Sequence, residues 1–145
     1  MEEEVIEIVI SQLDFYLIEK VRDMRINSIP YISQVALSQK LDLSEGFVSK
    51  VENFKQRARY NIRLVNRIVD IFNLQTYGDL FPAEIIKNDI VRIRIKLFKN
   101  TKSNSKKVDE EISKKKYQVI STIPLSEQEF LLWKSDKLEY LTIIK

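Results

Sequence analysis

Residues 33–53, with the sequence SQVALSQKLDLSEGFVSKVEN, constrain the fold of this chain more than any other stretch. Ser33 is a good N-cap for a first short helix, which continues to Leu41. Asp42 follows, a residue that tolerates the left-handed conformation that a tight turn requires. Leu43 then fills the corner after the turn. We therefore predict a short helix that ends in a tight turn.

The turn leads into a second short helix with two different faces. Ser44 caps this helix, and Val48 and Val51 face inward at a spacing of three residues. A short helix that buries one stripe and shows small and polar residues on the other has the shape to enter the major groove of DNA. The residues predicted at or near this outer face are Glu45, Gly46, Phe47, Ser49, Lys50 and Asn53.

This stretch resembles the helix-turn-helix of the Cro/phage-repressor type, known as the XRE family. The family's usual wording is S-Q-x-x-L-A, then L-G-V-S, then I-S-x-I-E-N. The chain has SQVALS at 33–38, LDLS at 41–44 and VSKVEN at 48–53. Ser38 stands where the family usually has Ala and Asp42 where it usually has Gly, and both residues are small or compatible with a turn. The resemblance covers about residues 11–82 and implies a bacterial, five-helix DNA-binding domain.

The composition argues against catalysis. The 145 residues include no histidine and no cysteine, which removes the commonest general base, the commonest metal ligand, thiolate sites and disulfides. Only two glycines occur, so a glycine-rich phosphate loop is not possible. The one dense carboxylate cluster, residues 109–111, lies in a polar stretch. We predict that the protein is not an enzyme and has no catalytic residue, metal site or cofactor.

The charges are distributed unevenly along the chain. Residues 1–30 hold seven acidic and three basic residues, a balance of −4. Residues 92–116 hold ten basic and three acidic residues, a balance of +7. This asymmetry indicates a polyanionic partner on one side, with a solvated lysine-rich loop as the alternative.

The N-terminal sequence does not have the pattern of a targeting segment. The apolar run Val5–Ile10 is interrupted by Glu7 and preceded by three glutamates, where a signal peptide has basic residues. No uninterrupted apolar run approaches the ~20 residues of a membrane span. We expect a cytoplasmic protein with no membrane partner.

Residues 1–82 are predicted to form one strand followed by helices. Residues 4–10 are rich in β-branched residues and are predicted as a strand, with an extension of the next helix as the alternative. A helix is predicted over 12–25 and ends at Asn27-Ser28-Ile29-Pro30. Asn61 is expected to cap a helix that continues to about Asn73, and Thr76 with Asp79 indicates a short fifth helix that Pro82 closes.

The remaining residues change from helical to strand periodicity. Strands are predicted over 89–98, 117–123 and 138–144, with a mobile basic loop over 99–116. Ser126 with Glu129 forms a capping box for one short helix. The predicted fold class is α+β, with a five-helix repressor-type domain followed by a small β-rich C-terminal unit. The predicted divisions are 1–10, 11–87 and 88–145.

Two sets of residues are predicted to touch DNA. Direct base contacts are expected near the start of the second motif helix. Alternatives stay open for Glu45, which is also favourable at a helix N-terminus, and for Phe47, which can pack back on the domain. The base-contacting set is Glu45, Gly46, Phe47, Ser49 and Lys50. The phosphate-contacting set, based on family position and positive charge, is Gln34, Ser44, Asn53, Lys55, Arg57, Arg59, Tyr60 and Arg63.

Three functions are compatible with these patterns. The first is a sequence-specific transcription regulator that acts as a homodimer on a palindromic operator of double-stranded DNA. The second is an antitoxin-like or other protein-binding module that uses residues 88–145. The third is non-specific nucleic-acid binding by the lysines of 92–116. Because short β segments leave unpaired edges, we expect residues 88–145 to form the homodimer contact, with the N-terminal strand as a further contributor.

Overall fold

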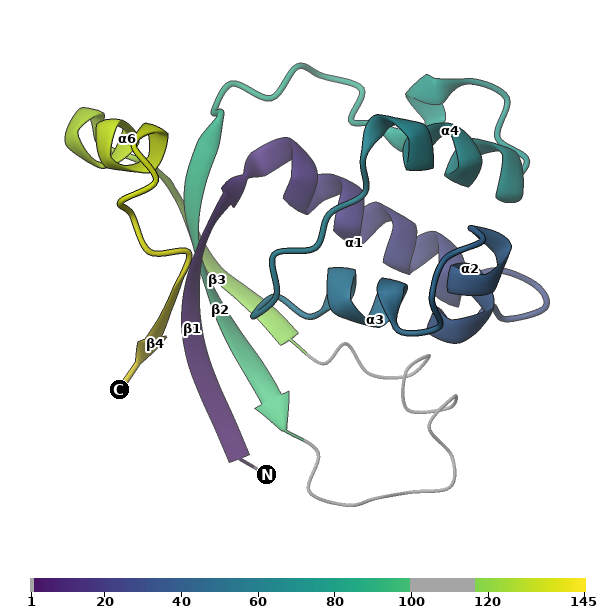
Figure 1. Ribbon diagram of the computed structural model, residues 1–145, viewed down its shortest axis with the longest axis horizontal. Coiled ribbons are helices and arrows are strands. Elements are labelled where there is room, and N and C mark those ends of the chain that lie inside the picture. The colour runs from purple at the N-terminus through teal and green to yellow at the C-terminus, as the bar shows by residue number, and fades with distance from the viewer. Residues whose placement is uncertain (1, 100–116) are drawn as a thin grey trace. The chain divides into compact units, whose positions relative to one another are not determined.

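The computed structural model describes residues 2–99 and 117–145. Contacts divide the chain into two compact units. The helical unit comprises residues 13–87, and the sheet unit joins residues 1–12 to residues 88–145 (Figure 1). The predicted mobile loop at 99–116 lies, except for Lys99 at the end of a strand, outside the described residues.

Residues 12–80 form four α-helices and a 3-10 turn. The elements are α1 (Gln12–Ile26), α2 (Gln34–Lys40), α3 (Phe47–Glu52), α4 (Ile62–Ile71) and η1 (Tyr77–Leu80). The fifth helix expected from Thr76 and Asp79 is therefore the short 3-10 turn η1, with the predicted capping box present. The core of the unit consists of apolar side chains from every element, including Phe15, Ile18, Val21, Leu37, Leu41, Val48, Val51, Leu64, Ile68 and Leu80.

Local signals explain where several helices begin. The side chain of Ser33 accepts a hydrogen bond from the amide of Ala36 and caps α2, and Asn61 caps α4 in the same way through Leu64. Helix α3 begins later than predicted, at Phe47, and its N-cap is Gly46.

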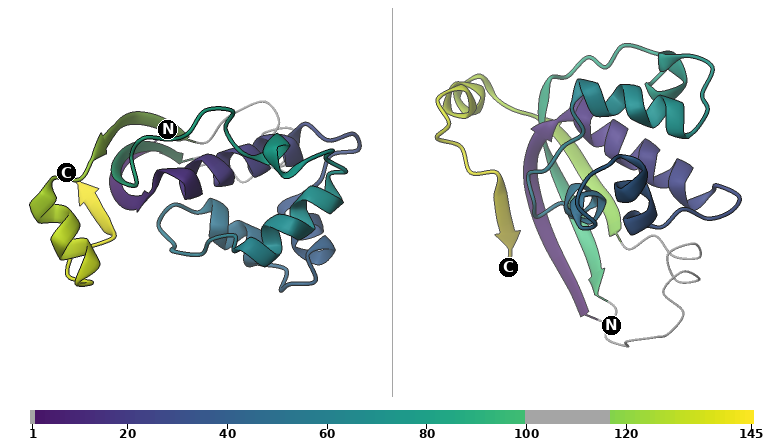
Figure 2. Two further views of the ribbon diagram at one scale, coloured as in Figure 1. Left: turned by 90° about the horizontal axis from the view of Figure 1, so that it is seen from above. Right: turned by 45° about the vertical axis from the view of Figure 1, so that its right-hand side comes forward.

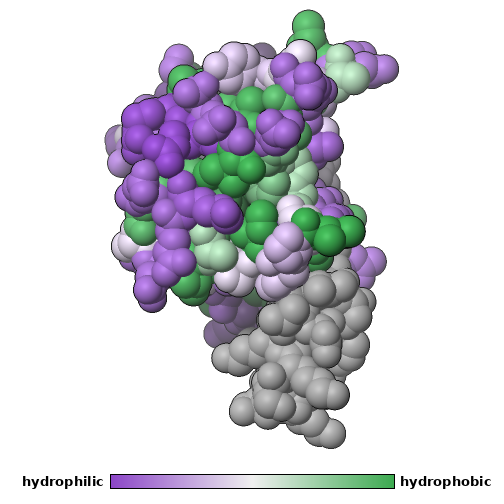
Figure 3. All heavy atoms as spheres, turned by 90° about the vertical axis from the view of Figure 1, so that its right-hand side faces the viewer, coloured by the Kyte–Doolittle hydropathy of each residue, from purple (hydrophilic) through white to green (hydrophobic). Residues whose placement is uncertain are grey.

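Side chains on the face of this unit seen in Figure 3 are mixed, with hydrophobic groups surrounded by hydrophilic ones.

The sheet unit contains a four-stranded antiparallel sheet in the order β3-β2-β1-β4. Its strands are β1 (Glu2–Ser11), β2 (Ile90–Lys99), β3 (Tyr117–Pro124) and β4 (Leu141–Ile144), and the helix α6 (Glu127–Lys134) lies between β3 and β4 in sequence. β1 and β2 pair over their full length, from Glu2 opposite Lys99 to Ser11 opposite Ile90. The two ends of the chain therefore build one sheet (Figure 1).

The two faces of the sheet differ in polarity. Ile6 is opposite Ile95 and Ile8 is opposite Ile93, and all four side chains are buried. On the other face Glu7 is opposite Arg94, and their side chains form an ion pair of 2.7 Å. This alternation is the period of two that the sequence shows in both strands.

The predicted fold class, a five-helix domain followed by a separate β unit, is wrong. The protein is α+β, but its first strand precedes the helices and pairs with the strands of the C-terminal part. The helix-extension alternative for residues 4–10 is wrong for the same reason. Pairing between β1 and β2 joins residues that are far apart in the chain, and no local pattern reveals such a partner.

None of the helices in the described part of the chain is both long enough and apolar enough to cross a membrane.

Candidate nucleic-acid interface

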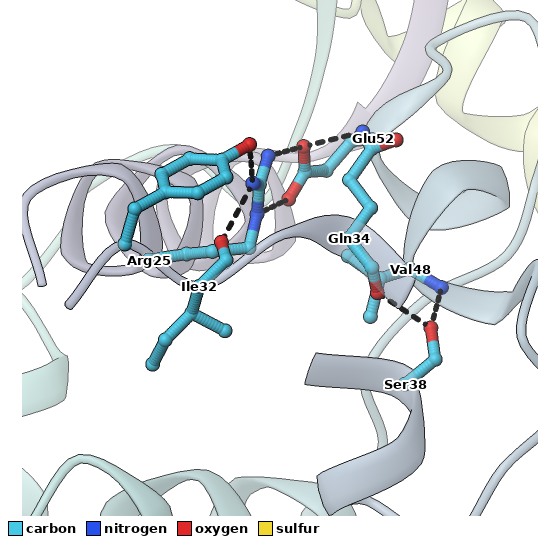
Figure 4. A network of polar contacts seen from close by, with 7 residues as sticks. Arg25, Ile32, Gln34, Ser38, Val48 and Glu52 are labelled. Atoms are coloured by element: carbon cyan, nitrogen blue, oxygen red, sulfur yellow. Dashed lines mark hydrogen bonds and ion pairs between the residues drawn. The ribbon is translucent and has the colours of Figure 1, made fainter. Parts of the chain in front are cut away.

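A buried ion pair holds α1 against α3. The guanidinium of Arg25 donates through Nε to Glu52 Oε2 at 3.0 Å and through Nη2 to Glu52 Oε1 at 2.7 Å (Figure 4). The two side chains are 0% and 4% exposed. Nη1 also donates to the carbonyl of Ile32 at 3.1 Å, so the pair reaches the loop before α2. Two-point pairing of this kind fixes orientation as well as distance.

A second set of hydrogen bonds connects α2 with α3. Gln34 Nε2 donates to Glu52 Oε1 at 2.9 Å. Ser38 Oγ donates to the carbonyl of Gln34 at 2.9 Å and accepts from the amide of Val48 at 3.0 Å (Figure 4). Because Gly46 has no side chain to cap α3, Ser38 of the neighbouring helix satisfies one of the amides at its start. The relative position of the two helices is thus fixed by polar contacts at both ends of α3.

The turn between α2 and α3 has the predicted backbone. Asp42 has φ of 59°, the left-handed conformation expected for this position. Arg67 of α4 donates through Nη2 to the carbonyl of Lys40 at 2.8 Å and to Asp42 Oδ2 at 3.0 Å. A cation from α4 therefore pairs with the end of α2, where carbonyl groups are left without helical partners.

The predicted base-contacting residues lie mostly on an open surface. Glu45, Gly46, Ser49 and Lys50 are exposed, while the inward pair Val48 and Val51 is fully buried as predicted. A Cβ added at Gly46 would meet no atom of another described residue within 4 Å, so the position beside the start of α3 is open.

Phe47 differs from the other members of that set. Its side chain is half-buried, and its ring lies 6.0 Å from the ring of Tyr60, tilted by 57°. This geometry supports the alternative in which Phe47 packs back on the domain.

The predicted phosphate-contacting residues differ in how far their side chains are exposed. Ser44, Asn53, Arg57 and Arg63 are exposed, and Lys55 is half-buried. Arg59 is half-buried and donates through Nη1 to the carbonyl of Ala58 at 2.8 Å. Arg59 thus contacts the chain just after α3, while Arg57 and Arg63 carry positive charge at the surface.

Two members of the phosphate set face the interior. Tyr60 is 4% exposed, and its hydroxyl has no hydrogen-bond partner among the described residues. Burial, and secondly the negative charge of Glu52, raise the pKa of Tyr60 far above its usual value, while Arg25 opposes this shift. We correct the prediction for Tyr60, because a buried hydroxyl cannot reach a phosphate. The amide of Gln34 is directed to Glu52.

Sequence reasoning missed Arg25, Ser38 and Arg67 as residues that shape this surface. One signal was available for Arg25, which lies four residues after Val21 on the apolar face of the predicted helix. A charged residue at such a position requires a buried partner. For Ser38 and Arg67 no local pattern indicates the contact.

The surface has a positive charge balance. Residues 44–63 hold five basic and two acidic residues, a balance of +3, and one of the two acids is Glu52, which Arg25 neutralises inside the unit. Residues 2–99 and 117–145 hold no group of three or more His, Cys, Asp or Glu side chains that could bind a metal ion. No protein family, curated protein or solved structure matches the chain.

Proposed function

We propose that the protein is a sequence-specific regulator that binds double-stranded DNA through the exposed face of α3. The single observation that carries this proposal is the two-sided structure of α3. Its inner residues Val48 and Val51 are 0% exposed, whereas Ser49 and Lys50 on its outer face are exposed. A helix that is held rigidly and presents polar side chains outward is suited to the major groove.

Three further features support DNA as the ligand. The open space at Gly46 allows a close approach of another molecule to the start of α3. The exposed cations Arg57 and Arg63 follow α3 in the sequence and are suitable partners for backbone phosphates. The resemblance of residues 33–53 to the XRE helix-turn-helix agrees with both features.

Operator recognition by one α3 would cover only a few base pairs, which is too short to specify a genomic site. We therefore propose that two copies act together on a palindrome with half-sites ~34 Å apart, or a multiple of that spacing. The sheet unit is our candidate for the contact between the copies.

The proposal is tested by selecting bound sequences from a pool of random duplexes with the purified protein. Specific regulation predicts enrichment of a palindromic motif and binding that resists excess random DNA. Enrichment of no motif, with binding abolished by random DNA, would indicate a non-specific binder. The absence of any binding would leave a protein-binding module as the function of the fold.

Lys50→Ala then tests base readout on the selected operator. We expect a loss of ~1–3 kcal/mol in specific binding, with little change for random DNA. The matched control is Lys87→Ala, which removes one exposed positive charge outside the proposed interface. Equal effects of the two substitutions would show that only net charge matters.

Arg57→Ala tests the phosphate assignment. We expect weaker binding to all sequences alike and a salt slope reduced by about one unit. A loss restricted to one base position would contradict this assignment.

A further inference from the structure

Helix α6 exposes an apolar surface although it is firmly attached. None of its residues is buried, and Leu131, Leu132 and Trp133 are 61%, 44% and 37% exposed. Its start is held by the Ser126–Glu129 capping box and by Arg92, whose Nη2 donates to Glu129 Oε2 at 2.6 Å. A short helix with four consecutive apolar residues, three of them exposed, is typical of a surface that another chain covers.

The neighbouring strand β4 has an open edge. It is the last strand in the order β3-β2-β1-β4, so no described strand pairs with its outer side. The amide of Val9 donates to the carbonyl of Tyr140 at 2.9 Å, which makes these residues a hydrogen-bonded pair. Since such pairs alternate along an antiparallel ladder, Leu141 and Ile143 direct their backbone groups away from β1. These outward groups can accept another strand.

The two edges of the sheet are not equally suited to pairing with a strand of another chain. β3, at the opposite edge, has a register shift beside Arg94 and Ile95 and ends at Pro124. Bulges and prolines are the usual features that blunt an edge strand. β4 contains neither, and α6 stands clear of the central strands on the β4 side of the sheet (Figures 1 and 2).

The sequence around β4 is complementary to itself. If two copies of β4 pair in antiparallel orientation about Thr142, Leu141 lies opposite Ile143 and Glu139 lies opposite Lys145. Centring on a neighbouring residue of the strand instead places Glu139 opposite Ile143 or Lys145 opposite Leu141. The register about Thr142 is also the one in which the outward groups of Leu141 and Ile143 bond each other.

We propose that a second copy of this chain docks on this surface, with the two β4 strands paired about Thr142 into a continuous eight-stranded sheet and α6 covering the seam. The complementary charges identify the occupant, because a two-fold axis places both Glu139–Lys145 pairs in register at once. This inference rests on the proposed function in one respect, because the dimer is the contact that operator binding requires. Dimerisation itself is tested without DNA.

The test is sedimentation of the full chain without DNA over a range of concentrations. We expect a dimer that dissociates on dilution. Glu139→Lys and Lys145→Glu each place like charges opposite one another twice, and each should weaken dimerisation about tenfold or more. The double variant restores opposite charges and should recover most of the loss. Lys137→Glu is the control, since it makes the same charge change at an exposed position outside the strand.

Leu131→Lys tests the contribution of α6 and should also weaken the dimer, with an unchanged circular dichroism spectrum because the side chain is already exposed. A monomer at every concentration would overturn the proposal. So would a dimer that both charge reversals leave intact, or one that the double variant does not rescue. A dimer that fails to bind DNA would contradict the proposed function alone, and a monomer that binds an operator would contradict this inference alone.

Discussion

In the helical unit residues 13–87 follow one another without interruption, whereas the sheet unit joins residues 1–12 to residues 88–145. The ion pairs of the two units differ as well. Arg25 and Glu52 are 0% and 4% exposed, while Arg94 and Glu7 are 42% and 16% exposed. The first pair is separated by 27 positions and the second by 87. The Arg25–Glu52 pair thus lies inside the helical unit, whereas the Arg94–Glu7 pair is partly exposed and joins two strands that are far apart in the sequence.

The difference teaches where each unit is sensitive. A buried pair in low dielectric is costly to break on one side, because the remaining charge has no water. A partly exposed pair is screened and contributes little. The helical unit should therefore respond strongly to single polar substitutions, and the sheet unit should respond to the loss of strand pairing.

The largest expected effect comes from shortening the chain. Residues 13–87 alone should keep their helical circular dichroism, because their buried ion pair and turn contacts are internal. Residues 1–87 should aggregate, because β1 then lacks both β2 and β4 and presents an unpaired apolar strand. Light scattering and circular dichroism on the two fragments measure this. Unfolding of the 13–87 fragment would break the comparison, since the helical unit would then depend on the sheet unit.

The next effect concerns the buried pair. Glu52→Leu should lower the free energy of unfolding by about 3–5 kcal/mol, because Arg25 remains buried without its partner. Chemical denaturation followed by far-ultraviolet circular dichroism measures the change in the free energy of unfolding. Combining it with Arg25→Met should recover much of the loss, since two apolar side chains replace two charges. A single variant as stable as the parent would show that water reaches Arg25.

A smaller loss is expected at Ser38. Ser38→Ala removes the oxygen that accepts from the amide of Val48 and leaves that buried donor without a partner. The cost should be about 1–3 kcal/mol in the helical unit. Ser33→Ala, which removes a partly exposed cap, is the comparison and should cost about 1 kcal/mol. A larger loss of stability for Ser33→Ala than for Ser38→Ala would show that burial does not determine which of these two hydrogen bonds contributes more.

Arg94→Ala is the matched test in the sheet unit. The pair with Glu7 is partly exposed, and Arg92 also lies 3.7 Å from Glu7, so the loss should stay below about 1 kcal/mol. The contrast with Glu52→Leu is the measured quantity. A loss as large as that of Glu52→Leu would place a strongly coupled charge network in the sheet unit.

The smallest effect is a dependence on acid at α6. Hydrogen bonding by the backbone of Ser126, and secondly by Arg92, lowers the pKa of Glu129 below its ordinary value of 4.5. Glu129 therefore contributes stability that is fully present above the unfolded pKa and is lost as the pH falls through the folded one. Glu129→Gln should reduce this acid-dependent loss, as measured by denaturation at neutral and acidic pH. If the free energy of unfolding of the variant depends on pH as that of the parent does, Glu129 does not contribute to the acid dependence.

Much of the helical unit could be predicted because its signals are local. Ser33, Asp42 and Asn61 mark a cap, a turn and a cap within a few residues of the backbone groups that they satisfy. The inward pair Val48 and Val51 follows from helical spacing. Local patterns were less reliable at helix ends. Helical spacing places Ile62 on the same face of α4 as Val65 and Ile68, yet Ile62 is 82% exposed while the other two are buried.

For the candidate interface, the sequence indicates positive charge after α3 but does not indicate which side chains are exposed. Positive charge after α3 is visible in the sequence, yet the sequence does not distinguish Arg57, whose side chain is exposed, from Arg59, whose side chain is half-buried. Tyr60 was assigned to the surface by its neighbours, and the structure buries it. Burial depends on which distant element packs over a residue.

The sequence by itself determined several short features of this protein, namely the Ser33 cap of α2, the turn at Asp42, the Asn61 cap of α4 and the alternation of the strands, because each depends on residues a few positions apart. Only the tertiary structure decided that the first strand joins the C-terminal strands, that Arg25 meets Glu52, and that α6 remains uncovered. These outcomes depend on contacts between distant segments, whose free energies compete across the whole chain. A short segment of the sequence therefore does not show which of these long-range contacts form.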